Sequence, residues 1–172
     1  MRDYFKPIAV LAVICLVISL ALAVTNAKTA PVIEEAAGRK AEQARKEVLP
    51  EADAFTQLTL SGLPASVTAV YRADNGAGCV FMLTAKGYGG DIELICGIDG
   101  TGKLTGCAVL SHSETQGLGS RVTLPDFQEQ FPGQDSALSG VDAISGATIS
   151  SRAYIDAVRD AFTAFELAGE AV

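Results

Sequence analysis

The chain has 172 residues, of which 49% are hydrophobic, and its formal net charge is −7 at neutral pH. This acidic balance excludes a nucleic acid as a partner, because phosphate backbones are bound by clustered basic side chains. The length allows one folded domain with a single hydrophobic core and is too short for several.

Residues 7–24 form an apolar run and predict a transmembrane helix. At about 1.5 Å per residue the run spans about 27 Å, which matches the hydrocarbon core of a bilayer. Arg2 and Lys6 precede it, so the positive-inside rule places residues 1–6 in the cytoplasm and the rest of the chain outside the cytoplasmic membrane. A signal peptide cleaved near residues 25–27 is the alternative, although such peptides have a shorter apolar region of about 7–15 residues.

Residues 25–54 are charged and rich in alanine, and they predict a helical stalk. Side chains of opposite charge recur three and four residues apart, as in helices with ion pairs on their surface. We expect the helix to run from about residue 33 to residue 48 and to end before Pro50. From the sequence alone, this helix is either a spacer that contacts the folded domain or a solvated element.

After residue 66 the pattern changes to strands. The chain has four runs of strand length, at residues 66–73, 78–85, 90–98 and 103–110. Short segments rich in Asp, Asn and Gly separate them, as in tight turns. Parallel strands need long crossovers, so these four strands are predicted to form an antiparallel meander.

Two helices are expected after the strands. A short one is predicted for residues 125–131, and the last begins at about Ile149, where apolar residues recur at spacings of three and four. The predicted fold class is α+β, with one transmembrane helix, a helical stalk and an antiparallel sheet with packed helices. The folded domain is assigned to residues 55–172.

The four cysteines do not form a recognisable framework. Cys15 lies in the apolar run, whereas Cys79, Cys96 and Cys107 lie in predicted strands without Cys-x-x-Cys spacing. We therefore interpret them as small hydrophobic residues and predict no metal site.

A small-residue motif stands at the start of the last helix: Ser145-Gly146-Ala147-Thr148, followed by Ser150 and Ser151. The first N–H groups of a helix have no partner within it, and together with the helix dipole they bind phosphate. Taken alone, the motif is explained more simply as a helix N-cap. A polar, glycine-rich loop about thirty residues upstream adds to it, with His112, Glu114, Thr115, Gly117, Leu118 and Gly119.

These two segments resemble motifs of the covalent FMN-binding domain family of respiratory flavoproteins. The family pattern is (Ser/Thr)-Gly-Ala-Thr followed by Ser or Thr, with an upstream loop His-x-Glu-Thr-Pro-Gly-Leu-Gly. Gln116 stands in the proline position of that loop. Two further pieces match, Val48-Leu49-Pro50-x-Ala52 and Lys86-Gly87-Tyr88-Gly89-Gly90. The family includes the G subunit of Rnf ion-translocating complexes and the C subunit of the Na⁺-translocating NADH:quinone reductase, and the chain length favours the former.

The resemblance implies that Thr148 carries FMN through a phosphoester bond made by a separate flavin transferase. Ser145, Ser150 and Ser151 are expected to donate hydrogen bonds near the phosphate, beside Gly146 and Ala147. The loop with His112, Glu114, Thr115, Gly117, Leu118 and Gly119 is expected to shape the ring site, and Thr148 and its neighbours to supply only the tether. Tyr88 either borders the flavin or is a plain turn residue.

The predicted function is electron transfer within an Rnf-type, membrane-bound ferredoxin:NAD oxidoreductase, with other membrane subunits as partners. The chain would then be a redox relay and not a complete enzyme, and no catalytic residue is assigned. The alternatives are a freestanding exported flavoprotein, the C subunit of the quinone reductase, and a membrane-anchored module without a redox role.

Overall fold

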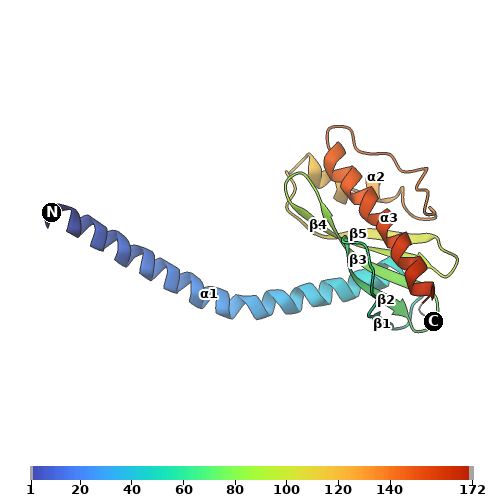
Figure 1. The fold of residues 1–172 in the computed structure, drawn as a ribbon, viewed down its shortest axis with the longest axis horizontal. Helices are drawn as coiled ribbons and strands as arrows, with labels where there is room; N and C mark the ends of the chain where they lie inside the picture. Colours follow the sequence, from blue (N-terminus) through green and yellow to red (C-terminus); the bar gives the residue numbers. More distant parts are fainter. Residues whose placement is uncertain (1, 171–172) are drawn as a thin grey trace. The chain divides into compact units, whose positions relative to one another are not determined.

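The computed structural model describes residues 2–170, and the side chains of residues 7–169. The elements, in chain order, are α1 (Arg2–Val48), β1 (Phe55–Leu58), β2 (Val67–Ala73), β3 (Gly78–Lys86), β4 (Asp91–Asp99), β5 (Leu104–His112), the 3₁₀ helix η1 (Gly119–Thr123), α2 (Pro125–Gln128) and α3 (Thr148–Glu170) (Figure 1). They form two units, Met1–Lys40 and Ala41–Val172. The predicted α+β class is confirmed.

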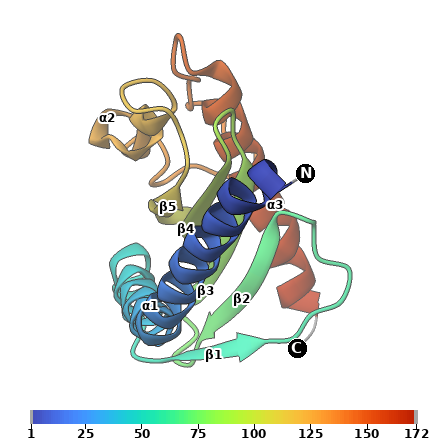
Figure 2. The same cartoon turned by 90° about the vertical axis from the view of Figure 1, so that its left-hand side faces the viewer.

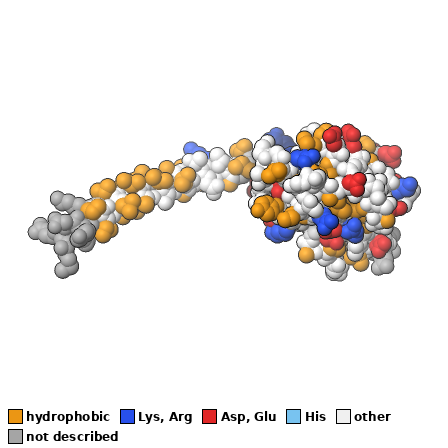
Figure 3. Space-filling view, turned by 90° about the horizontal axis from the view of Figure 1, so that it is seen from above, with side chains coloured by type: hydrophobic (Ala, Val, Ile, Leu, Met, Phe, Trp, Pro, Cys, Tyr) orange, Lys and Arg blue, Asp and Glu red, His pale blue; other side chains and the backbone are white. Residues whose placement is uncertain are grey.

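The N-terminal unit is a single helical rod. The large apolar side chains from Ile8 to Val24 are 48–68% exposed, and Figure 3 shows them along this rod. Among the described residues, one helix is long and apolar enough to cross a membrane. This helix is α1, and its apolar run of residues 7–24 lies in the N-terminal unit. The predicted helix start at residue 33 is wrong, because α1 is continuous from Arg2. The Thr25 and Thr29 hydroxyls donate to carbonyls one turn back, so they do not interrupt the helix.

The second unit contains a five-stranded antiparallel sheet in the order β1-β2-β3-β4-β5 (Figure 2). The four predicted strands correspond to β2–β5, so the predicted meander is confirmed. The edge strand β1 was missed, because its four residues are too few to show a two-residue period. It pairs with β2 from Phe55 opposite Ala73 to Leu58 opposite Val70.

Alternating side chains of the strands point to opposite faces of the sheet. In β3, Phe81 and Leu83 point into the core under α3, whereas Val80 belongs to a second cluster on the other face. Near the N-terminal end of α3, the Tyr154 ring lies 5.3 Å and 5.1 Å from those of Phe127 and Phe131. This aromatic group fixes the start of α3 above the sheet, and the start of α3 forms part of the site described below. The predicted last helix is confirmed, beginning one residue earlier, whereas α2 ends at Gln128, short of the predicted end at residue 131.

The last turns of α1 cover the other face. Ala44, Val48 and Leu49 are buried there. The Val48 carbonyl accepts a hydrogen bond from the Thr105 hydroxyl, and a Cβ on Gly97 would lie 2.6 Å from that carbonyl oxygen. Because α1 ends at Val48, the predicted helix end before Pro50 is confirmed. The contacts of Val48 and its neighbours show that this part of the helix packs against the sheet and is not only solvated. The compact unit begins at Ala41, whereas the sequence-based division placed residues 25–54 in a stalk.

The cysteines of the sheet contribute to its packing. Cys79 and Cys96 are buried on the α3 face, and Cys107, opposite Cys96 in the neighbouring strand, is half-buried. Burial raises the pKa of the Cys96 thiol well above its ordinary value and also raises the pKa of Cys79. Both thiols therefore stay protonated, and their interpretation as small hydrophobic residues is confirmed.

Candidate functional site: a pocket at the start of helix α3

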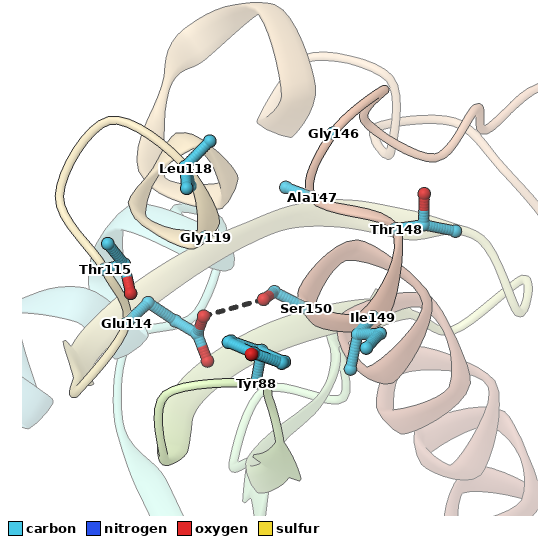
Figure 4. Close-up of a pocket in the computed structure, with 10 residues that line it drawn as sticks. All are labelled: Tyr88, Glu114, Thr115, Leu118, Gly119, Gly146, Ala147, Thr148, Ile149 and Ser150. Carbon is cyan, nitrogen blue, oxygen red and sulfur yellow. Dashed lines mark hydrogen bonds between the residues drawn. The ribbon is translucent and has the colours of Figure 1, made fainter.

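A pocket of about 450 Å³ opens beside the first turn of α3. Three segments distant in sequence line it: the β3–β4 turn with Tyr88, the loop after β5, and the residues around Thr148 (Figure 4). The lining residues are Tyr88, Glu114, Thr115, Leu118, Gly119, Gly146, Ala147, Thr148, Ile149 and Ser150. The structure thus brings the two sequence motifs to opposite walls of one cavity.

The first turn of α3 presents a hydroxyl and N–H groups that have no partner within the helix. Thr148 is exposed, and Ser151 donates its N–H to the Ala147 carbonyl at 3.0 Å, in the i to i−4 pattern of a helix. The N–H groups of the three preceding residues lie at positions that a helix start leaves without intrahelical partners. Gly146 has a φ of 81°, which a glycine adopts without strain. This combination suits a phosphate held at the helix start.

Two serines of the motif make other contacts. The Ser150 hydroxyl donates to Glu114 Oε2 at 2.7 Å, and the Ser151 hydroxyl donates to the Ala147 carbonyl at 2.9 Å. Both residues are almost fully buried. Their expected role as phosphate donors is therefore not supported by this geometry, because the protein itself already accepts each hydroxyl proton. Ser145 is exposed, and its carbonyl accepts a hydrogen bond from the Arg121 guanidinium at 3.1 Å.

Hydrogen bonds between its own residues and with the end of β5 hold the loop after β5 in shape. His112 is the last residue of β5 and not, as predicted, part of the loop; it is half-buried, and its Nδ1 accepts the Glu114 N–H at 3.2 Å. Gly117 has a φ of 77° and donates its N–H to the Ser120 hydroxyl at 2.8 Å. Neither His112 nor Gly117 lines the pocket. Their contacts indicate that they shape the loop that carries Glu114, Thr115 and Leu118.

Two further apolar side chains lie at the pocket. Tyr88 is 76% exposed and Ile149 is 58% exposed, and Leu118, on the loop after β5, is 53% exposed. Ile149 was not among the predicted site residues, and it contradicts the expectation that the tether segment offers no large side chain. The sequence contained a signal for Ile149: this apolar residue lies off the face of α3 that is buried in the core, and in the structure it is exposed. For Tyr88 the structure favours the bordering position over the plain turn.

Comparison with known proteins agrees with this geometry. The FMN-binding domain family model matches residues 87–163, which include every residue of the pocket. The G subunit of the ion-translocating oxidoreductase complex of Methanosarcina acetivorans is 37% identical over 93% of this chain and 93% of its own length. The chain belongs to this G-subunit family. The G subunit of the Na⁺-translocating ferredoxin:NAD⁺ oxidoreductase complex of Acetobacterium woodii is 30% identical over 90% of this chain and 87% of its own length. The proton-translocating counterpart from Clostridium ljungdahlii is 26% identical over 88% of this chain and 85% of its own length.

This member of the G-subunit family is a membrane protein with FMN as its cofactor, and it forms part of a larger complex. The residues of the pocket fit FMN. Tyr88, Leu118 and Ile149 offer exposed apolar surface suited to a flat ring system, and the start of α3 offers N–H donors suited to a phosphate. Glu114 is the one ionisable side chain in the pocket apart from Tyr88, and its carboxylate is already engaged by protein donors.

Proposed function

We propose that this chain is the electron-transfer subunit of an Rnf-type ferredoxin:NAD oxidoreductase and that it carries FMN covalently on Thr148. The observation that supports this most directly is the position of the Thr148 side chain. Thr148 is exposed at the edge of the pocket, whereas Ser150 and Ser151, the serines that follow it in α3, are buried and their hydroxyls donate to protein acceptors. Within the first turn of α3, Thr148 therefore carries the hydroxyl that is open to modification, and Ser145, which is also exposed, does not line the pocket.

Attachment requires a phosphoryl transfer to that hydroxyl. Thr148 Oγ would attack the FMN phosphorus of FAD, the P–O bond to AMP would break, and the hydroxyl proton would pass to a base of the transferase. We propose that a separate flavin transferase performs this step and reads the exposed segment around Ser145 and Gly146. The phosphodiester then carries a negative charge next to the N-terminus of α3, whose dipole stabilises it.

The protein's contribution after attachment is positional. Bound FMN supplies one- and two-electron redox chemistry, and the surrounding residues orient it and adjust its environment. Tyr88, Leu118 and Ile149 line the pocket and would limit the positions open to the ring, and a covalent tether would prevent loss of the cofactor by dilution. The domain is then a relay that exchanges electrons with neighbouring subunits of the complex.

We also propose that the FMN domain lies outside the cytoplasmic membrane. Arg2 and Lys6 precede the apolar segment, and basic residues favour the cytoplasmic side. A cofactor outside the cell is the case in which a covalent bond brings the largest advantage, because a dissociated flavin could not be recaptured there.

Peptide mass and flavin fluorescence test the attachment site. The tryptic peptide of residues 122–152 from native membranes should be heavier by the mass of FMN less one water. Thr148→Ala should remove in-gel flavin fluorescence completely and leave a folded protein, and Thr148→Ser should be labelled partially at most. Thr115→Ala removes the other exposed threonine hydroxyl of the pocket and should stay fluorescent. Fluorescence that persists in Thr148→Ala would refute the assignment.

Protease accessibility tests the orientation. Protease added to intact spheroplasts should degrade the folded domain and leave a short fragment that ends near Lys28. A domain that is protected until the membrane is permeabilised would reverse the orientation, and flavin attachment outside the cell would be excluded with it.

A further inference from the structure

The buried carboxylate of Glu114 lies where the three walls of the pocket meet. Its residue is 8% exposed, although it belongs to a loop whose neighbours Ser113 and Thr115 are exposed. One oxygen, Oε1, accepts the Gly89 N–H of the β3–β4 turn at 3.0 Å. The other, Oε2, accepts the Ser150 hydroxyl of α3 at 2.7 Å, as the dashed line in Figure 4 shows. One side chain therefore connects all three segments.

Two glycines make room for this carboxylate. A Cβ built on Gly87 would lie 1.9 Å from Oε1, and one built on Gly119 would lie 1.9 Å from Oε2. Real Cβ atoms do not approach an oxygen so closely, so any other residue at either position would displace the carboxylate. Neither glycine has a positive φ, so their requirement is space and not backbone conformation.

The charge of Glu114 is balanced by dipoles. Within residues 7–169, no lysine or arginine forms an ion pair with it, and the ion pairs of this region lie elsewhere. A buried carboxylate without donors would be costly, but each oxygen here accepts one hydrogen bond and the N-terminus of α3 lies next to it. Removing one donor therefore leaves a buried charge partly unsatisfied, which costs more than the loss of an exposed hydrogen bond.

We infer that Glu114 is a positioning residue that fastens the β3–β4 turn, the loop after β5 and the first turn of α3 together before any flavin is attached. It acts on FMN through Gly89 and Ser150, and not as a direct ligand. Ser150 is its partner in this role, which explains why a serine of the flavin motif is buried and turned away from the phosphate site. The inference rests on the proposed function only for the identity of the ligand, because the fastening exists in the protein without flavin.

The chain contains a matched control for this pair. Ser111 donates to Glu93 Oε2 at the same distance of 2.7 Å, but both side chains are exposed on neighbouring strands away from the pocket. The two Ser–Glu pairs thus share chemistry and length and differ in burial and location. An exposed pair of this kind contributes little, because water replaces either partner.

The test uses the full-length chain in detergent, purified without flavin from cells that lack the transferase. Glu114→Ala, Ser150→Ala and the double variant form one thermodynamic cycle, and Glu93→Ala, Ser111→Ala and their double variant form the control cycle. We expect the Glu114–Ser150 coupling to change the unfolding equilibrium constant by roughly tenfold or more, and the control coupling by less than about threefold. Hydrogen exchange of the Gly89 amide should accelerate about tenfold or more in Glu114→Ala, and not in Glu93→Ala.

Glu114→Gln keeps the inference testable if the alanine variant does not fold. Its amide keeps an acceptor for Gly89 and can donate to the Ser150 oxygen, so stability and Gly89 protection should lie between those of wild type and Glu114→Ala. Coexpression with the transferase should then give a covalent flavin yield in the same order. Unchanged stability and unchanged Gly89 exchange in both Glu114 variants would overturn the inference. A wild-type chain that never acquires flavin would refute the proposed function, while these flavin-free measurements would still decide the role of Glu114.

Discussion

The loop after β5 and the segment before α3 use the same backbone device for different tasks. Each contains a glycine in the left-handed region, Gly117 at a φ of 77° and Gly146 at 81°, and a Cβ on either would meet no atom within 4 Å. The loop leads into a short 3₁₀ helix and buries the Glu114 carboxylate. The other segment leads into a helix of 23 residues and leaves the Thr148 hydroxyl exposed. Similar turn chemistry therefore does not imply a similar role, because the neighbouring side chains differ: Glu114, before the first turn, is buried, whereas Thr148, after the second, is exposed.

Of the substitutions that distinguish the loop after β5 from the segment at the start of α3, Gly119→Ala should have the largest effect on stability. The new Cβ would lie 1.9 Å from Glu114 Oε2, so the carboxylate must move and its contacts to Gly89 and Ser150 must break. We expect a loss of unfolding free energy of about 1–3 kcal/mol and a reduced yield of covalent flavin, measured by thermal unfolding and in-gel fluorescence.

Gly100→Ala is the control for that substitution. Its Cβ would lie 3.5 Å from the nearest atom, which is ordinary contact. Equal stability of the Gly119 and Gly100 variants would show that space around Glu114 does not limit the fold.

Gly117→Val tests whether the loop shapes the ring site. A β-branched residue at a φ of 77° is strained, at about 1–3 kcal/mol, and the loop should shift to relieve the strain. Because Thr148 lies on the other wall, attachment should persist while the visible spectrum and reduction potential of the flavin change. A redox titration at equal covalent flavin content measures this.

Gly62→Val reproduces the strain at a distant site, since Gly62 has a φ of 80° and open space around it. It should destabilise the domain by a similar amount and leave the potential unchanged. A Gly117 variant with wild-type spectrum and potential would mean that this loop does not influence the ring.

Leu118→Ala and Ile149→Ala compare the apolar surface of the two walls. Both side chains are more than half exposed, so each substitution should change the free energy of unfolding of the flavin-free protein by less than about 0.5 kcal/mol. If both walls contact the ring, each variant should increase quenching of flavin fluorescence by an added collisional quencher. An effect in Leu118→Ala alone would restrict the ring site to the loop.

Asp99→Asn should have the smallest effect on stability. Asp99 serves as a reference for Glu114, because its carboxylate orders a turn but lies outside the pocket. Partial burial raises the pKa of Asp99, but hydrogen bonds from Thr101 and Lys103 outweigh it, so its pKa lies below the ordinary value of 3.8. A folded pKa below the unfolded one adds stability that is present at neutral pH and is lost as the pH falls through the folded pKa. The wild type should therefore lose stability relative to Asp99→Asn only in acid, as thermal unfolding between pH 7 and pH 2 would show.

Local patterns in the sequence determined much of the architecture. The turn segments with Asp, Asn and Gly fixed the limits of β2–β5 to within one or two residues, because turn conformations depend on the residues inside the turn. Pro50 marked the end of α1, since a proline disfavours helical backbone in the residue before it. The two flavin motifs were likewise visible, because each is a short continuous segment.

The tertiary structure decided what depends on residues distant in the chain. The pairing of β1, the packing of Val48 against the second face of the sheet and the burial of Tyr154 have no local period that identifies them. The same holds for the side chains of the motifs. The sequence grouped Glu114 and Ser150 with the flavin contacts, but only the folded chain brings Gly87, Gly89 and Gly119 to that carboxylate. A motif names the residues of a site, whereas the packing of its neighbours determines which of them are free to meet a ligand.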